Sequence, residues 1–586
     1  VPFANVVLVG TSLGGTTDDN GRFEIEDIPT GEYGLKVSLL AYQQKIVKFE
    51  LLANQTLNLG SISLETDMLG LDEVVVSGTM KEVSRLESSV PVEVYSKVFF
   101  RANPTPSIFE SLQNVNGVRP QLNCNVCNTG DIHINGLEGP YTMVLIDGMP
   151  IVSGLSTVYG LTGIPQSLIE RVEIVKGPAS TLYGSEAVGG MINIITKKPS
   201  SAPRAAVDVF ATGWGEVNTD VGLKFNVGNK VSSLLGVNYF NYKNPIDNNN
   251  DGFTDLTLQD RISVFNKINI ERKDNRVFTL AGRYVYEDRW GGEMDWTDEY
   301  RGGDEIYGES IYTNRWEVFG LYQLPLKETV NFQFSANGHS QNSVYGNVFY
   351  LADQYIGFGQ LTWNKKVNRH DMLVGSAYRY TYYDDNTPAT FNAIADTNQA
   401  SIIHLPGLFI QDEISLNEFN KVLLGVRYDY NSLHGNIFTP RINYKWNTAN
   451  KKNVLRISAG NGYRVANVFT EDHAALTGAR TVEFQGELDP ETSWNANVNF
   501  VKRFYTKSNG VIGIDATAFY TYFTNRILPD YESDPNKIIY GNLDGSSVSR
   551  GVSLNTDLAL TNGFKALAGV TIMDVSVMEN GERFRQ

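Results

Sequence analysis

The feature that most constrains the fold is a regular alternation of apolar and polar residues that begins near residue 204 and continues for hundreds of residues. In residues 494–500, Trp494, Val498 and Phe500 point to one side of a predicted strand and three asparagines to the other. A soluble sandwich buries its apolar side. A membrane barrel turns that side to lipid and keeps a polar lumen. Similar alternation occurs at residues 378–382 and 426–430.

Composition agrees with a barrel and excludes other classes. A chain of 586 residues would ordinarily suggest several soluble domains of about 150 residues each. The 54 Gly, 30 Tyr and 29 Phe fit one large, polar-lined barrel better. No apolar run approaches the ~18 residues of a transmembrane helix. A net charge of −16 without a basic stripe argues against a nucleic-acid surface, which needs Lys and Arg to neutralise phosphates.

Residues 169–197, IERVEIVKGPASTLYGSEAVGGMINIITK, are the most informative single segment. They predict a strand, a Gly-Pro turn, a short Ala-rich segment, two adjacent glycines and a second strand. The glycines at 177, 184, 189 and 190 suit turns with positive φ or close packing in a narrow lumen. Upstream, residues 141–146 predict a strand that ends in an Asp147-Gly148 turn.

These segments resemble the plug domain of TonB-dependent outer-membrane receptors. The run Leu71, Asp72, Glu73, Val74, Val75, Val76 is similar to the TonB box of such receptors in Bacteroidetes-type bacteria. Residues 439–444, 462–466 and 487–495 resemble barrel strands of the same family. The resemblance implies a mainly β fold: a 22-stranded transmembrane antiparallel β-barrel with an α+β plug in its lumen. It also implies that the chain is not an enzyme.

Four segments are expected. Residues 1–66 resemble a carboxypeptidase-regulatory-like β-sandwich, truncated at its N-terminus, with strands at 5–9, 22–25 and 34–37 and a turn at 18–21. Residues 67–84 are a linker with the TonB box, and residues 85–200 form the plug, with a helix over 106–113 capped by Ser107. Residues 201–586 form the barrel. About 18 strand-like segments are recognisable, so about four C-terminal strands are expected to be missing.

The 71–76 run has a physical reason to bind a partner. An exposed β-prone segment can add to the edge of a partner's sheet through main-chain hydrogen bonds, almost irrespective of its side chains. In isolation the run could equally be an ordinary linker strand. Its position directly before a plug-like domain favours the TonB box.

Cys124 and Cys127, the only cysteines, form a Cys-x-x-Cys on the predicted apical plug loop, with Asp131 and His133 close behind. One hypothesis is a local disulfide, because such receptors face an oxidising envelope compartment. The other is a soft-metal site, since thiolates and an imidazole suit copper or zinc. The family usually has Arg where His133 stands, which favours a ligand role over an inward-facing structural histidine.

Asp247, Asn249, Asp251 and Asp255 carry the Asp-x-Asn-x-Asp-Gly spacing of a calcium loop. The twelfth position is Leu258 rather than a bidentate Glu. A weak Ca²⁺ site in an extracellular loop and a plain polar loop are both compatible with this pattern. No cofactor is required by the predicted fold.

Two further segments are candidate ligand contacts. His473 lies between residues 463–466 and 488–491, where haem receptors of the family place an iron-ligating histidine; both flanking motifs differ here. Residues 287–316, rich in Trp, Tyr, Asp and Glu, are expected to form an external loop. Their acidic balance suits a cationic or metal-bearing ligand, although solvated loops commonly have this composition.

The predicted function is TonB-dependent import of a scarce metal-containing nutrient, a ferric siderophore or a copper or zinc complex, across the bacterial outer membrane. Haem or cobalamin import is the alternative within the family. Lys176-Gly177-Pro178 stands where the carbohydrate-importing branch of the family usually has Lys-Asp-Ala, which favours the siderophore, cobalamin, haem or metal branch. The expected partners are TonB with ExbB and ExbD, outer-membrane lipid and a surface lipoprotein. The N-terminal domain is expected in the periplasm. A passive porin and a secreted enzyme are the alternatives from other classes.

Overall fold

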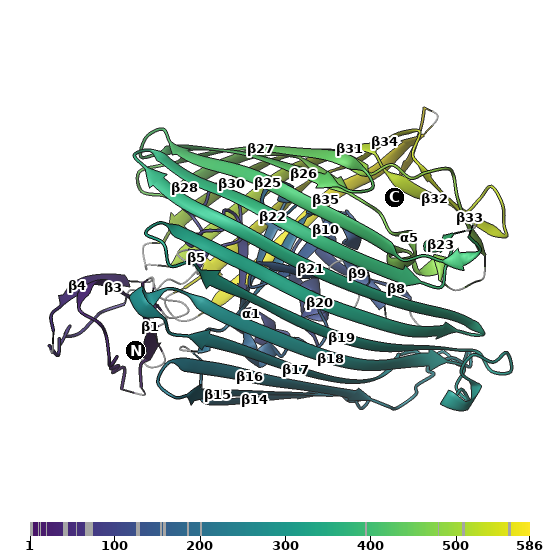
Figure 1. Cartoon of the computed structure of the whole chain (residues 1–586), viewed down its shortest axis with the longest axis horizontal. Helices are drawn as coiled ribbons and strands as arrows, with labels where there is room; N and C mark the ends of the chain where they lie inside the picture. Colours follow the sequence, from purple (N-terminus) through teal and green to yellow (C-terminus); the bar gives the residue numbers. More distant parts are fainter. Residues whose placement is uncertain are drawn as a thin grey trace.

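The computed structural model describes residues 4–9, 11, 13–18, 20–38, 45–53, 55–64, 74–124, 129–152, 155, 160–184, 187–199, 202–392, 395–476, 478, 480–506, 510–560, 564–579 and 581–585. The dominant element is an 18-stranded sheet in which each strand pairs antiparallel with the next strand of the order. The sheet curves around the plug (Figure 1). No helix in the described part of the chain combines the length and apolarity needed to cross a bilayer.

The 18 strands follow chain order around the sheet. They are β14 (Ala205–Ala211), β15 (Val217–Val227), β16 (Val231–Tyr242), β17 (Leu258–Ile270), β18 (Phe278–Gly292), β19 (Gly308–Gln323), β20 (Thr329–Tyr345), β21 (Val348–Val367), β22 (His370–Asp385), β25 (Ser401–Ser415), β26 (Asn420–Asn431), β27 (Gly435–Asn447), β28 (Asn453–Arg464), β30 (Glu491–Tyr505), β31 (Val511–Asn525), β34 (Gly545–Ala559), β35 (Lys565–Glu579) and β36 (Glu582–Arg585). The total of 22 strands stays a prediction.

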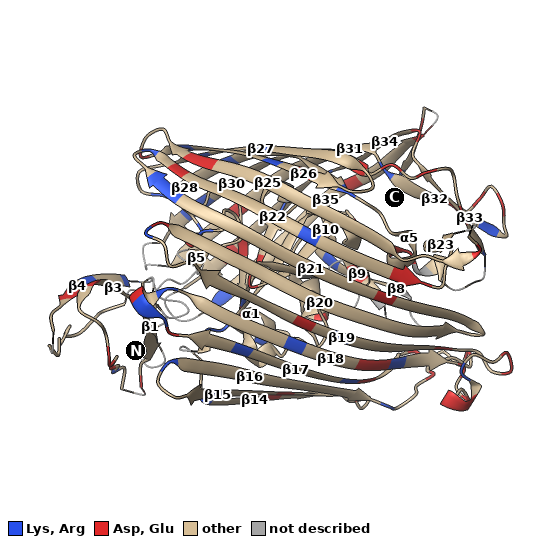
Figure 2. Ribbon diagram, in the orientation of Figure 1, with Lys and Arg blue, Asp and Glu red and all other residues tan. Residues whose placement is uncertain are grey.

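The predicted inversion of the two faces is confirmed in β30. Trp494 and Val498 are 53% and 45% exposed, whereas Asn495 and Asn497 are buried on the lumen side. The same holds in β26, where tyrosines face outward and Arg427 and Asp429 face inward. Charged residues are sparse along the strands in Figure 2. An apolar outer face with a polar lumen is what a barrel in lipid requires.

The two ends of the barrel differ. Tight turns such as 228–230 and 368–369 join strands at one end, and the other end carries the long connections 465–490 and 526–544. Short turns are typical of the periplasmic end and long loops of the outside. The loop end holds β23 (Phe391–Asn392), β24 (Thr397–Asn398), α5 (Val468–Glu471), η7 (His473–Ala475), β29 (Thr481–Phe484), β32 (Ile527–Asp530), β33 (Lys537–Asn542) and η6 (Asp298–Tyr300), and η5 (Lys273–Asn275) lies in a turn at the opposite end.

The prediction that residues 287–316 form a loop is wrong for half of their length. Only residues 293–307 connect strands, because β18 continues to Gly292 and β19 begins at Gly308. One of the acidic side chains in this stretch, Glu287, pairs with Arg289 and Arg261 in the lumen. Amino-acid composition alone does not distinguish a charged residue that faces the lumen from one in a solvated loop.

The plug contains a five-stranded sheet of order β11-β10-β13-β12-β7. Its strands are β7 (Glu93–Ser96), β10 (Thr142–Ile146), β11 (Met149–Val152), β12 (Ile169–Lys176) and β13 (Gly190–Thr196). The plug also contains two separate strand pairs: β5 (Val74–Val75) with β6 (Val83–Ser84), and β8 (Val118–Cys124) with β9 (Thr129–Ile134). The predicted Asp147-Gly148 turn is present, with φ of 50° and 80°. Such values fit the type I′ turn of a tight hairpin.

Short helices complete the plug. They are α1 (Lys97–Ala102), α2 (Ile108–Ser111), α4 (Ser180–Tyr183), η1 (Leu112–Asn114), η2 (Gly139–Tyr141) and η3 (Gln166–Leu168). Ser107 caps α2 as predicted, by accepting from the Glu110 N–H. The predicted 106–113 helix is broken into α2 and η1.

The plug fills the lumen and bonds to strands around it. Barrel side chains donate to its backbone from several strands: Arg283 to Gly160, Arg456 to Ser88, Asn497 to Lys176 and Ser549 to Asn135. Gly177, at φ 124°, lies so close to Asn497 that a Cβ would collide with it, which explains why glycine is needed there.

The N-terminal domain is a four-stranded antiparallel sheet of order β2-β1-β3-β4, built from β1 (Asn5–Leu8), β2 (Gly14–Thr16), β3 (Gly31–Ser38) and β4 (Lys45–Leu51). It lies at the short-turn end of the barrel (Figure 1). The predicted strand at 22–25 is wrong: Phe23 and Ile25 pack against the core of this sheet without joining its ladder. Their alternation reflects one-sided burial rather than strand pairing.

Candidate functional site

A cavity of ≈ 410 Å³ opens between the apex of the plug and the loop end of the barrel. Ligand sites typically enclose ~300–1,000 Å³ and combine apolar walls with a few polar groups. This cavity has that character. Its lining includes Pro140 and Thr142 from the plug, Arg379, Tyr383, Ile403 and Leu405 from the barrel wall, and His434, Val468, Phe469, Glu471, Phe484 and Asp489 from the loops.

Burial shifts the pKa of two titratable groups in this lining. Burial raises the pKa of Glu471 to about 7, although Arg464 opposes the shift. Burial lowers the pKa of His434, against the pull of Asp489 and Glu487. His434 is therefore a neutral imidazole at pH 7, and Glu471 changes charge around that pH.

A charged network joins the wall of this cavity to the plug. Glu491 accepts from Arg464 Nε at 2.6 Å and from the hydroxyl of Tyr141 at 2.8 Å. Arg464 also pairs with Glu471 at 2.6 Å. The guanidinium groups of Arg464 and Arg526 lie 4.5 and 5.7 Å from the centre of the Tyr141 ring. The plug apex is thus held by a charged network that reaches the cavity through Glu471.

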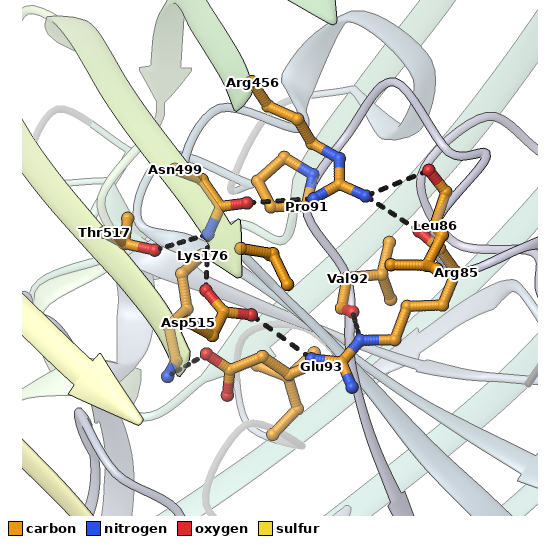
Figure 3. A pocket seen from close by; sticks show the side chains of 12 residues that line it. Arg85, Leu86, Pro91, Val92, Glu93, Lys176, Arg456, Asn499, Asp515 and Thr517 are labelled. Carbon is orange, nitrogen blue, oxygen red and sulfur yellow. Dashed lines mark hydrogen bonds and ion pairs between the residues drawn. The ribbon is translucent and has the colours of Figure 1, made fainter. Parts of the chain in front are cut away.

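A second network lies deeper, between plug and barrel, around a cavity of ≈ 20 Å³ (Figure 3). Arg456 donates to the carbonyls of Arg85 and Leu86 and to Asn499 Oδ1. Arg85 pairs with Asp515 at 3.3 Å. In the same view Lys176 pairs with Glu93 at 2.7 Å. Arg85 and Lys176 each have a carboxylate partner, whereas Arg456 is satisfied by main-chain carbonyls and an amide oxygen, so each buried charge has hydrogen-bond partners.

The described part of the predicted TonB box begins with β5, which lies at the end of the plug away from the ≈ 410 Å³ cavity (Figure 1). Leu71, Asp72 and Glu73 lie outside the described residues. Val74 and Val75 form β5, and Val75 is fully buried in an apolar cluster with Met143 and Leu145. An exposed connector is therefore the wrong description at Val75, which packs in the core of the plug.

The cysteine-based candidate is only partly within the described region. Cys124 ends β8 and its side chain is not described, and Cys127 lies outside the described residues. Asp131 and His133 do meet, with Oδ1 2.9 Å from Nε2, and Asp131 also accepts from the Gly139 N–H. Among the described residues no group of three or more His, Cys, Asp or Glu side chains is arranged to hold a metal.

The predicted calcium loop uses its carboxylates internally. Asp247 accepts from the N–H groups of Asp251 and Gly252, and Asp255 accepts from Asn248. Asn249 donates to Asp251 at 2.9 Å. These turns hold the oxygens close together. Calcium at this loop stays a prediction.

His473 begins η7 at the loop end, but its side chain lies outside the described region. The sequence did not single out His434, which lines the cavity. His434 is an isolated histidine in a short connection between two strands, so its place in the cavity is visible only in the folded chain. Arg464 and Glu491 were part of recognised motifs, but no role was assigned to them.

A lumen-filling plug in a strand-built barrel with a ligand-sized cavity above it defines a plugged outer-membrane receptor. Comparison with known proteins identifies the family. Residues 209–584 match the TonB dependent receptor-like, beta-barrel family, residues 84–191 the TonB-dependent Receptor Plug Domain, and residues 1–76 the CarboxypepD_reg-like domain. The chain belongs to the TonB-dependent receptors, a family of outer-membrane receptors and not of enzymes.

Individual relatives are more distant. The chain is 25% identical over 424 residues to the iron-regulated outer membrane virulence protein of Vibrio cholerae, covering 68% of this chain and 61% of that protein. The siderophore receptor PirA from Pseudomonas aeruginosa aligns with TM-score 0.60 at 15% identity, covering 84% and 88% of the two chains. The siderophore receptor PiuA from Acinetobacter baumannii gives 0.63 at 16% identity, covering 86% and 82%. These structural likenesses support the fold.

Proposed function

We propose that this receptor imports a metal-bearing nutrient, a ferric siderophore or a copper or zinc complex, across the outer membrane with energy supplied by TonB. The observation that carries the proposal is the ≈ 410 Å³ cavity at the loop end of a barrel whose lumen is filled by the plug. A ligand can enter from outside, but the plug closes its way inward. A passive porin would lack the plug.

The relatives support a metal-bearing ligand. The Vibrio cholerae relative is described as iron-regulated, and the two solved relatives as siderophore receptors. TonB, driven by ExbB and ExbD, would pair with residues 71–76 as an added strand and pull on the plug. A surface lipoprotein that delivers the ligand remains part of the proposal.

Haem is the second candidate, and His434 favours it. Its imidazole lines a cavity with aromatic walls and is neutral at pH 7, the form that ligates iron. A His434→Gln variant would lose haem binding by about tenfold or more if the imidazole is an iron ligand, and would keep binding of a coordinatively saturated ferric chelate.

Direct binding tests separate these ligands. The purified receptor would be titrated with a ferric tricatecholate, a ferric trihydroxamate, haem, cyanocobalamin, Cu(I) and Zn(II), and a deletion strain grown on each as sole source. Micromolar or tighter binding of one probe, matched by loss of growth on it, is the expected result. Binding of none, with unchanged growth, would contradict metal-nutrient import.

The Cys124–Cys127 pair is tested in the same assay. If its thiolates hold copper or zinc, a Cys124→Ser/Cys127→Ser variant loses the metal found by elemental analysis. Undiminished metal content and uptake would remove the thiolate hypothesis and leave the disulfide, which thiol titration detects.

A further inference from the structure

Ser77, directly after the predicted TonB box, has each of its polar atoms bonded. Its N–H and Oγ donate to Glu173 Oε2 at 2.9 and 2.7 Å. Its Oγ accepts from Asn193 Nδ2 at 2.9 Å, and its carbonyl accepts from the Tyr183 hydroxyl at 3.1 Å. We call Ser77, Glu173, Tyr183 and Asn193 the Ser77 clamp.

The partners of Ser77 lie on the plug sheet and on one short helix. Glu173 lies on β12, Asn193 on the neighbouring β13 and Tyr183 on α4. Ser77, Glu173 and Asn193 are fully buried. A load applied at Ser77 therefore reaches two adjacent strands of the plug sheet at once.

Glu173 is the residue that makes the clamp hard to open. Its Oε2 also accepts from the Val76 N–H at 2.9 Å, and its Oε1 accepts from Arg171 Nε at 2.8 Å. Displacing Ser77 would take its N–H and its hydroxyl away from the buried Glu173 carboxylate. A buried charge without its partners is strongly unfavourable. The clamp should therefore survive fluctuations that release less firmly held segments.

The chain before Ser77 makes fewer polar contacts, although Val75 is buried in an apolar cluster. Val74 and Val75 pair with Val83 and Ser84 through a ladder of only two residue pairs. Beyond Ser77, the Gly78 carbonyl accepts from Arg441 at 3.4 Å, and Lys81 forms an ion pair with Asp371 of the barrel wall. The carbonyls of Arg85 and Leu86, further on, accept from Arg456 (Figure 3). Ser77 thus marks the border between a segment that can peel away and the body of the plug.

We propose that the Ser77 clamp is the point at which force applied to residues 71–76 enters the plug, with Glu173 as its positioning residue. This inference rests on the proposed function, because the force is supplied by TonB. The clamp limits undocking to residues up to 75, because the Val76 N–H also donates to Glu173, and it transmits the pull to β12 and β13.

Single-molecule force spectroscopy on the full receptor in a supported bilayer tests this assignment, with the TonB C-terminal domain on the probe tip. With the clamp intact, the first resistance occurs when the chain before Ser77 is taut. In Ser77→Ala and Glu173→Gln, we expect the force of that first peak to fall at least twofold. Resistance would then return at Lys81, which pairs with Asp371, up to about 14 Å further out, since four residues span about 3.4 Å each.

Thr79→Ala is the matched control. Thr79 lies two residues further on and is buried, and its Oγ1 makes no hydrogen bond in the structure. In this variant, the force of the first peak and the extension at which it occurs should equal those of the wild-type receptor. Correct insertion of each variant is checked by heat-modifiable electrophoretic migration. If Glu173→Gln does not insert, Ser77→Ala decides the result alone.

If Ser77→Ala and Glu173→Gln both give the force–extension curve of the wild type, the assignment is overturned. It is also overturned if Thr79→Ala lowers the first peak as much as the clamp variants do. Absence of any tether between the TonB domain and the wild-type receptor is a different result. It would overturn the proposed TonB coupling itself, and with it the role of the clamp.

Discussion

The two ends of the plug are built in opposite ways. At the short-turn end, Ser77 is buried and fully bonded by Glu173, Tyr183 and Asn193. At the loop end, the plug apex borders a cavity of ≈ 410 Å³. A rigid attachment suits the place where force arrives, and an open, partly polar space suits the place where a ligand arrives. The same domain can therefore serve as a receptor on one side and as a lever on the other.

The largest expected effect concerns the short-turn end. Val74→Pro removes a backbone N–H and fixes φ, so residues 71–76 can no longer pair fully with a partner strand. Uptake of the bound nutrient should fall to background, on the order of 100-fold, while ligand binding at the loop end is unchanged. Val74→Ala is the control and should transport normally. Normal uptake by the proline variant would show that the two ends are not coupled through this segment.

A smaller effect is expected where the loop end holds the plug apex. Glu491→Ala removes the acceptor of Tyr141 and the partner of Arg464. Breaking a buried ion pair typically costs about 3–5 kcal/mol. Urea unfolding followed by tryptophan fluorescence should show a loss of that size in the free energy of unfolding. A loss below about 1 kcal/mol would mean that the apex is held mainly by packing.

These two ends also differ in how far the sequence predicts them. The strands, the Asp147-Gly148 turn and the cap at Ser107 follow from local patterns, since alternation and turn chemistry act over a few residues. The Ser77 clamp could not be predicted, because Glu173 and Asn193 lie about a hundred residues away in the chain. The cavity is built from several separate connections, and His434 carries no local signal. The buried position of Val75 was missed because three valines suit an edge strand and a core equally well.

Calcium gives a weaker test of loop rigidity near the cavity end. If residues 247–255 bind Ca²⁺ with a dissociation constant near 1 mM, 10 mM Ca²⁺ stabilises the folded receptor by about 1.4 kcal/mol. Thermal unfolding with and without a chelator measures this. An Asp247→Asn/Asp251→Asn variant should show no response. Equal responses of wild type and variant would exclude the loop as the site.

The smallest predicted effect is the pH response of the cavity. Because burial raises the pKa of Glu471 to about 7, its carboxyl is neutral at pH 6 and charged at pH 8. An anionic ferric chelate should bind about fivefold more weakly at pH 8, which corresponds to roughly 1 kcal/mol of repulsion. In the folded state the raised pKa favours the protonated form, so its contribution to stability is full below pH 4.5 and is lost as the pH rises through 7.

Glu471→Gln removes this titration and should bind the same chelate equally at both pH values. Isothermal titration calorimetry at pH 6 and pH 8 provides the comparison. If the variant keeps the wild-type pH dependence, another group in the cavity is responsible.

The most direct test of the account measures binding and uptake separately in cells that express the receptor. The probe is the ⁵⁵Fe-labelled chelate that binds best, and the proton gradient is collapsed with a protonophore. The account predicts that surface binding persists while uptake stops. Uptake that continues at the same rate would contradict it, because a plug held in the lumen cannot open without an external pull.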